Sequence, residues 1–146
     1  SSIESTDLDD CGYSLNIMNK EEGYPVKTYD RPVKRYCRCI EISDNPELIR
    51  RYREVHNKEK HWKEIRDGIR QVGILEMEMY IAGSKVFMIM DTEMDFDWKR
   101  DMARLATLPR QAEWENFVSE LQGCDPNATS AQKWTLMDRM FYLYED

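Results

Sequence analysis

The chain has 146 residues and a net charge of −7, because 21 Lys and Arg residues stand against 28 Asp and Glu residues. This length suits a single domain. A hydrophobic fraction of 41%, with 4 Trp, 8 Tyr and 4 Phe, supplies enough apolar side chains for a core and excludes a wholly disordered chain. The acidic balance, without a stripe of Lys and Arg between aromatic residues, argues against nucleic acid as a partner.

Composition also argues against membrane insertion and secretion. The longest apolar run, residues 86–90, falls far short of the roughly 18 residues of a membrane-spanning helix, so no membrane partner is expected. Residues 1–10 carry four acidic side chains and lack the basic and apolar regions of a secretory signal. The four cysteines lack zinc spacing and are interpreted as small apolar side chains in a cytoplasmic protein. They are Cys11, Cys37, Cys39 and Cys124.

The sequence divides into a polar extension at residues 1–32, partly disordered or docked, and a patterned domain at residues 33–146. Alternating side chains predict a first strand from Val33 to Glu41. Residues 44–47 then combine a capping Asp or Asn with Pro46, which is typical of a helix start. Helical spacing continues to Val72 before Gly73, and residues 58–60 allow two helical pieces.

The second half predicts a hairpin, two helical stretches and a closing strand. Apolar and polar residues alternate over 75–81, a turn follows at 82–85, and residues 86–90 suit a central strand. A helix is expected to start at Asp95 or Asp97, and another after Pro109. Apolar residues between 134 and 143 indicate a final strand.

The predicted order is strand, helix, strand, strand, helix, strand. This indicates an α+β protein of the ferredoxin-like βαββαβ class, with one antiparallel four-stranded sheet and helices on one face. The other face carries apolar side chains that one subunit cannot cover. We therefore expect a homodimer of the dimeric α/β barrel type.

His56 is the first candidate for proton transfer. It follows Tyr52 by one helical turn, so both side chains point the same way if the helix continues there. Histidine titrates near neutral pH and can both donate and accept a proton. The alternative is a histidine on the helix surface. Glu76 and Glu78 share one face of their strand and could do acid/base work or form a solvated face.

No cofactor or metal motif is present. The acidic residues between 91 and 101 lack the order of a calcium-binding loop, and we interpret them as solvated charges at a helix start. The sequence contains no Gly-rich phosphate loop, nucleophile elbow or zinc-binding H-E-x-x-H motif. We expect neither a cofactor nor a metal.

The residues resemble the L-rhamnose mutarotase family from Val33 to Leu143. The resemblance rests on the combined order of four features, no one of which is diagnostic. They are Tyr52-Arg53-Glu54-Val55-His56-Asn57, Trp62-Lys63-Glu64-Ile65, the hairpin at 80–90 and Met140-Phe141-Tyr142-Leu143. The resemblance implies a cofactor-independent, dimeric isomerase that interconverts the α and β anomers of a 6-deoxy sugar.

Carried over by position, the resemblance makes His56 the catalytic proton donor and Tyr52 a substrate contact. The tandem tryptophans of the family fall at Glu113 and Trp114, and its second substrate tyrosine falls near Met77. Two aromatic contacts are thus replaced by a carboxylate and a thioether, and the chain has a two-residue insertion between His56 and Trp62 and a shorter hairpin turn. Both L-rhamnose and L-fucose stay open as the substrate.

The resulting hypothesis is a mutarotase in which His56 protonates the ring oxygen and Trp114 stacks on the sugar. Glu113 or Glu76 is the candidate partner base, and a monosaccharide is the expected ligand. One alternative is a non-catalytic sugar-binding or regulatory dimer that lost turnover through the changes at Met77 and Glu113. Another is a small monooxygenase-like dimer of the same architecture, which no residue specifically favours.

Overall fold

The computed structural model describes residues 20–57 and 59–144. The chain divides into two compact units, Ser1–Asp30 and Arg31–Asp146. In the first unit the described residues contain a short 3-10 helix, η1 (Lys20–Glu22). Most of the extension predicted at residues 1–32 lies outside the described residues. The second unit holds, in chain order, β1 (Lys34–Glu41), α1 (Pro46–Val55), α2 (Lys63–Gln71), β2 (Ile74–Ala82), β3 (Lys85–Thr92), α3 (Trp98–Ala106), α4 (Gln111–Gln122), α5 (Ser130–Lys133) and β4 (Thr135–Leu136).

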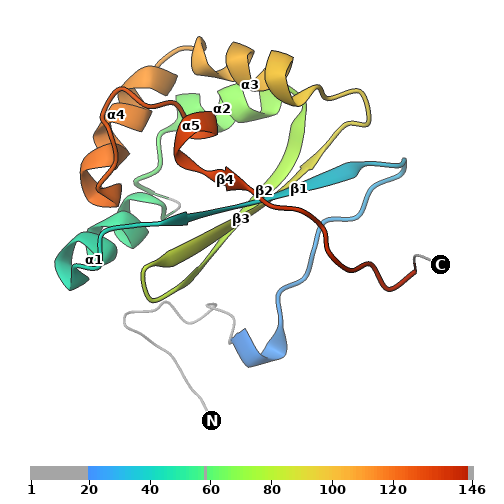
Figure 1. The fold of residues 1–146 in the computed structure, drawn as a ribbon. Helices are drawn as coiled ribbons and strands as arrows, with labels where there is room; N and C mark the ends of the chain where they lie inside the picture. The colour runs from blue at the N-terminus through green and yellow to red at the C-terminus, as the bar shows by residue number, and fades with distance from the viewer. Residues whose placement is uncertain (1–19, 58, 145–146) are drawn as a thin grey trace. The chain divides into compact units, whose positions relative to one another are not determined.

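The four strands form one antiparallel sheet in the order β2-β3-β1-β4. Helices follow the first and third strands, which confirms the predicted α+β class and gives the strand order of a ferredoxin-like fold. Helices α2, α3, α4 and α5 gather over one face of the sheet (Figure 1). Strand β3, the continuous apolar run, is central as predicted.

Strand register decides which side chains face the helices. Met90 of β3 pairs with Tyr36 and Met77, and the next position on this face, Met88, pairs with Arg38 and Met79. Met88 and Met90 are both buried. Arg38 therefore shares the helix face of the sheet with core methionines, while the residues between them lie on the opposite, open face.

Local capping explains where the helices begin and end. The Asn45 side chain accepts hydrogen bonds from the backbone N–H groups of Glu47 and Leu48, and Pro46 takes the first helical position. Helix α1 stops at Val55, so the predicted break between two helical pieces is confirmed. Gly73, at φ +96°, turns the chain from α2 into β2 in a conformation that favours glycine.

The predicted closing strand is wrong beyond its first residues. Strand β4 contains only Thr135 and Leu136, and one further backbone bond joins Met137 N–H to the Cys37 carbonyl. Past that point the described chain has no strand pairing and ends in a turn at residues 143–144, so the apolar pattern has no sheet to pack on. Met140 is 95% exposed and Phe141 72% exposed.

The described cysteines are free thiols. Cys37 and Cys39 alternate with the helix-face residues of β1, and both lie on the open face. Cys124 is also free, while Cys11 lies outside the described residues. In residues 20–57 and 59–144, no helix combines the length and apolar character that crossing a bilayer requires.

Candidate functional site

His56 is the C-cap residue of α1 and lies beside Tyr52, one turn earlier. Their ring centroids are 4.5 Å apart, and His56 Nδ1 lies 2.7 Å from the Tyr52 backbone carbonyl oxygen. A carbonyl oxygen can only accept, so Nδ1 carries the hydrogen of the neutral imidazole. The Nε2 lone pair is thereby left for a ligand. His56 is largely buried and is not the surface histidine of the alternative interpretation.

The Tyr52 hydroxyl ends a buried hydrogen-bond chain. Gln122 Nε2 donates to the Tyr52 oxygen at 3.2 Å, and Lys133 Nζ donates to Gln122 Oε1 at 2.8 Å. Lys133 also pairs with Glu115 at 3.0 Å, although its side chain is fully buried. Because Gln122 Oε1 is occupied by an ammonium group, its amide must present Nε2 to Tyr52. The chain holds the phenol in place.

Burial keeps both groups at this site neutral near pH 7. It lowers the pKa of His56 below its usual 6.5, against the opposing effect of the bond to the Tyr52 carbonyl. It raises the pKa of Tyr52 to about 12, so the phenol stays protonated. The site therefore offers an unprotonated imidazole nitrogen beside a hydroxyl group.

Trp114, from α4, packs against both histidines of the chain. Its ring centroid lies 5.5 Å from that of His56 and 4.7 Å from that of His61, both edge to face. Trp62 contacts the same ring at 5.1 Å. Trp114 is only 5% exposed, so its ring is fixed by this packing.

Two hollows have His56 in their walls. The central cavity, of about 60 Å³, lies between the sheet and the helices, and its wall includes Arg38, Tyr52, His56, His61, Met77 and Trp114. The outer cleft, of about 530 Å³, includes His56, His61, Arg66, Arg70, Glu76 and Met77. The cleft is in the size range of small-molecule sites, which is about 300–1,000 Å³. A ligand in the cleft would meet both histidines, which line its boundary with the central cavity.

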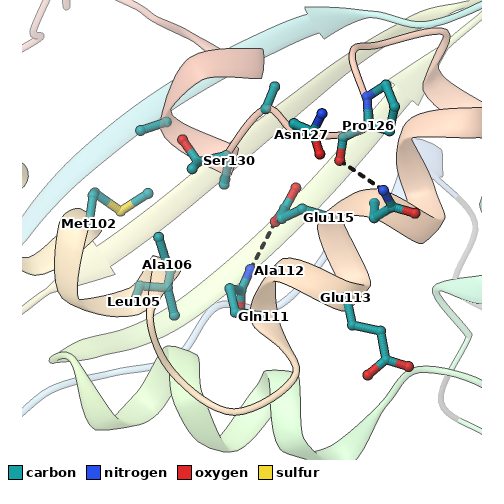
Figure 2. A pocket seen from close by; sticks show the side chains of 14 residues that line it. Met102, Leu105, Ala106, Gln111, Ala112, Glu113, Glu115, Pro126, Asn127 and Ser130 are labelled. Carbon is teal, nitrogen blue, oxygen red and sulfur yellow. Dashed lines mark hydrogen bonds between the residues drawn. The ribbon is translucent and has the colours of Figure 1, made fainter.

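A third hollow, the lateral pocket, lies between α3, α4 and the loop that leads into α5 (Figure 2). Its volume is about 340 Å³. The side chains of Gln111 and Glu115, joined at 2.8 Å, line both this pocket and the central cavity. Glu113 also lines the pocket and points away from Glu115, where it pairs with Arg110 at 3.1 Å.

The structure thus brings together most of the residues proposed from the sequence. Tyr52, His56, Met77 and Trp114 line the central cavity, and Glu76 joins His56 and Met77 in the outer cleft. Glu113 is the exception, since it lines the lateral pocket and neither of the hollows that contain His56.

Arg38 and His61 are among the cavity residues that sequence reasoning missed. Arg38 had a signal in the alternation of β1, where it is a charged side chain in phase with Tyr36 and Ile40. His61 had a weaker signal, as the only other histidine in the chain. In the described part of the chain, no group of three His, Cys, Asp or Glu side chains is arranged to hold a metal ion.

This fold and site define a ferredoxin-like α+β protein with a polar, histidine-containing cavity between sheet and helices. Comparison with known proteins places it further. The model of the L-rhamnose mutarotase family matches residues 35–143. The chain therefore belongs to the L-rhamnose mutarotase family, whose members are isomerase-type enzymes.

Individual relatives agree with this placement. The chain is 30% identical over 113 residues to an L-fucose mutarotase of Xanthomonas campestris, a match that covers 77% of this chain and 90% of the relative. It is 28% identical over 114 residues to a UPF0734 protein of Dictyostelium discoideum, covering 75% and 90%. Its fold is similar to a crystal structure of an L-rhamnose mutarotase from Formosa agariphila, with a TM-score of 0.57 and 16% identity over 75% of this chain and 98% of the other.

Proposed function

We propose that the protein interconverts the α and β anomers of a 6-deoxyhexose, L-fucose or L-rhamnose, by acid/base ring opening at His56 without a cofactor. The observation that carries this proposal is the orientation of His56. Its Nδ1–H is bonded to the Tyr52 carbonyl, and its Nε2 atom is left for a ligand on a wall that the cavity and the cleft share. Membership of the family supplies the reaction class.

In this mechanism Nε2 first takes the proton of the anomeric hydroxyl. The C1–O5 bond breaks, its electron pair stays on the ring oxygen, and the O1 electrons form the C1=O1 double bond of the aldehyde. His56 then delivers its proton to the ring oxygen. After rotation about C1–C2 the ring closes on the other face of C1 and the proton transfers reverse, so no net proton is consumed.

The surrounding groups support the sugar during this exchange. Tyr52 has a protonated hydroxyl that can donate to a sugar oxygen, while Trp114 and Met77 give apolar surface to the C–H groups of the ring. Glu76 is the candidate for a second proton-transferring group, since it lines the outer cleft with His56. We assign no role to Glu113 in this reaction because it lines the lateral pocket, away from His56, and its carboxylate pairs with Arg110.

L-fucose is the first sugar to test. The L-fucose mutarotase relative shares 30% identity over most of its length, whereas the likeness to the L-rhamnose mutarotase structure supports the fold alone. The two sugars differ in the orientation of ring hydroxyls, so direct competition between them identifies the preferred stereochemistry.

We also propose that the protein works as a homodimer. The C-terminal segment, residues 137–144, exposes Phe141, Leu143 and Tyr144 by 70% or more. Half-buried apolar groups, including Phe87 and Ile89, lie on the open face of the sheet. Exposed apolar side chains of this kind are typical of a protein interface, and a second copy would cover them.

The deciding experiment is NMR saturation transfer between the α and β anomers of L-fucose, then of L-rhamnose, with and without the protein. Faster exchange with either sugar supports the proposal. Binding of the sugar without faster exchange would replace it with the non-catalytic sugar-binding function. If neither sugar binds and neither sugar exchanges its anomers faster, the mutarotase and the sugar-binding function are both excluded.

A further inference from the structure

Two buried side-chain nitrogen atoms in the described part of the chain have no hydrogen-bond partner, and both belong to residues that line the central cavity. They are Arg38 Nε and His61 Nδ1. Buried polar groups in folded proteins are nearly always paired, so each exception calls for a specific explanation. That both occur around the cavity that contains His56 indicates a shared cause.

Arg38 is a buried cation with weak partners. Its side chain is on the helix face of β1 and the residue is 1% exposed. One terminal nitrogen bonds to the hydroxyl and carbonyl oxygen of Ser130, and the other meets only the Met88 sulfur. Thioether sulfur is a weak acceptor, so the guanidinium still has N–H groups that can donate to a ligand.

The aromatic neighbours of Arg38 hold it in place without saturating its N–H groups. The guanidinium carbon lies 5.4 Å from the ring centroids of both Trp98 and Trp134. Burial lowers the pKa of Arg38 to about 10, which still leaves the side chain charged at neutral pH. A fixed, charged donor on a cavity wall suits an oxygen-rich ligand.

His61 meets the same cavity from the segment between α1 and α2. Its ring centroid lies 5.8 Å from that of His56, and its edge packs on Trp114. Burial, with smaller contributions from His56 and Arg66, lowers the pKa of His61 to about 4, against the opposing effect of the neighbouring Trp62 backbone. His61 is therefore neutral at physiological pH, with one nitrogen that donates and one that accepts.

We propose that Arg38 and His61 are substrate-binding residues, whose unpartnered nitrogen atoms take their hydrogen bonds from hydroxyl groups of the sugar. This inference rests on the proposed function, because it names the groups that would hydrogen-bond the hydroxyl groups of a neutral sugar at the same site. A cavity of this size also admits water, which can satisfy these atoms in the resting protein and be displaced by sugar hydroxyls.

The test compares matched variants by sugar affinity and by anomer exchange. Arg38→Met and His61→Leu remove the nitrogen atoms, while Arg38→Lys keeps a cation and His61→Asn keeps a polar group near the Nδ1 position. Arg35→Met is the control, since Arg35 lies on the same strand but on the open face, where it pairs with Asp91 at 2.7 Å. The Kd for L-fucose comes from NMR titration, kcat and KM from saturation transfer, and thermal unfolding reports folding.

For Arg38→Met we expect Kd and KM to rise about tenfold to a hundredfold, the range for a bond from a charged donor. For His61→Leu we expect a rise of about two- to tenfold. Arg38→Lys and His61→Asn should recover part of the affinity. Arg35→Met should leave Kd and KM within about twofold even if it lowers the unfolding temperature, because removing the ion pair with Asp91 affects stability and not the cavity.

Analogues of L-fucose that each lack one hydroxyl give the decisive comparison. A residue that binds a hydroxyl loses its effect on Kd with the analogue that lacks that hydroxyl. An unchanged Kd in folded Arg38 and His61 variants overturns the inference, and so does a loss of affinity that is equal with every analogue. In either case, anomer exchange by the wild-type protein still supports the mutarotase. If the wild-type protein neither binds L-fucose or L-rhamnose nor accelerates the anomer exchange of either sugar, both proposals fail.

Discussion

His56 Nδ1 is bonded at 2.7 Å to the backbone carbonyl oxygen of Tyr52. The acceptor belongs to the main chain of α1, so no change of side chain at position 52 removes it. The orientation of the imidazole is therefore a property of the end of the helix. Because Nδ1 is committed to this bond, Nε2 is the nitrogen through which His56 can act.

Replacing His56 should abolish most of the catalysis and preserve the fold. We expect His56→Gln to reduce anomer exchange by about 10²–10⁴-fold, because an amide near the Nε2 position can hydrogen-bond but cannot carry the proton. NMR saturation transfer measures the rate, and circular dichroism checks folding. Exchange within threefold of wild type would remove His56 from the mechanism.

Removing the Tyr52 hydroxyl should affect stability and activity together. Tyr52→Phe leaves Gln122 Nε2 without its acceptor, at a cost of about 1 kcal/mol in the free energy of unfolding. Exchange should slow by roughly tenfold, less than in His56→Gln, because the phenol orients the sugar and His56 moves the proton. Tyr80→Phe is the matched control, since the Tyr80 hydroxyl bonds Glu78. Equal effects of the two variants on exchange would contradict this role.

The exchange rate should depend on pH through a group that titrates below the usual histidine value. His56 acts through its neutral form, and burial lowers its pKa below 6.5. The rate should therefore be highest near and above neutral pH and fall with a midpoint below 6.5, as Nε2 becomes protonated. Rates corrected for uncatalysed exchange, measured from pH 4.5 to 8, test this. A midpoint at or above 6.5 would show that burial does not control the site.

Glu76 and Glu78 of β2 test whether a carboxylate in the outer cleft takes part in catalysis. Glu76 lines the outer cleft with His56, whereas Glu78 accepts a hydrogen bond from Tyr80 at 2.7 Å. We expect Glu76→Gln to lower kcat about a hundredfold or more, within the range for an acid/base group. Glu78→Gln should change kcat by less than twofold. If Glu76→Gln had the same kcat as the wild type, Glu76 would not be the proton-transfer partner of His56.

The dimer is tested through the C-terminal segment. Because Phe141 and Leu143 are 72% and 70% exposed, changing both to Asp should cost little in the isolated subunit and disrupt an apolar interface. Light scattering after size-exclusion chromatography should give twice 17.5 kDa, or 35 kDa, for the wild type and 17.5 kDa for the variant. A wild-type mass of 17.5 kDa would rule out the dimer under these conditions.

Local signals in the sequence predicted most of the architecture. Asn45 with Pro46 marked the start of α1, Gly73 marked the turn into β2, and alternation over 75–81 marked β2 itself. These features depend on neighbours only a few residues away, which is why a linear pattern reveals them. The prediction of a closing strand failed at residues 137–144, where apolar residues were present but no strand lay beside them to complete a ladder.

By itself, the sequence determined the α+β class, the element order and the pairing of Tyr52 with His56 across one helical turn. Only the tertiary structure decided which charges share the cavity. Arg38 lies 18 residues before His56 in the chain, and Glu113 was expected at the site but lines the lateral pocket. Side-chain burial and hydrogen bonding depend on how β1, α1 and α4 pack, and contacts between residues far apart in the chain leave no spacing in the sequence to read.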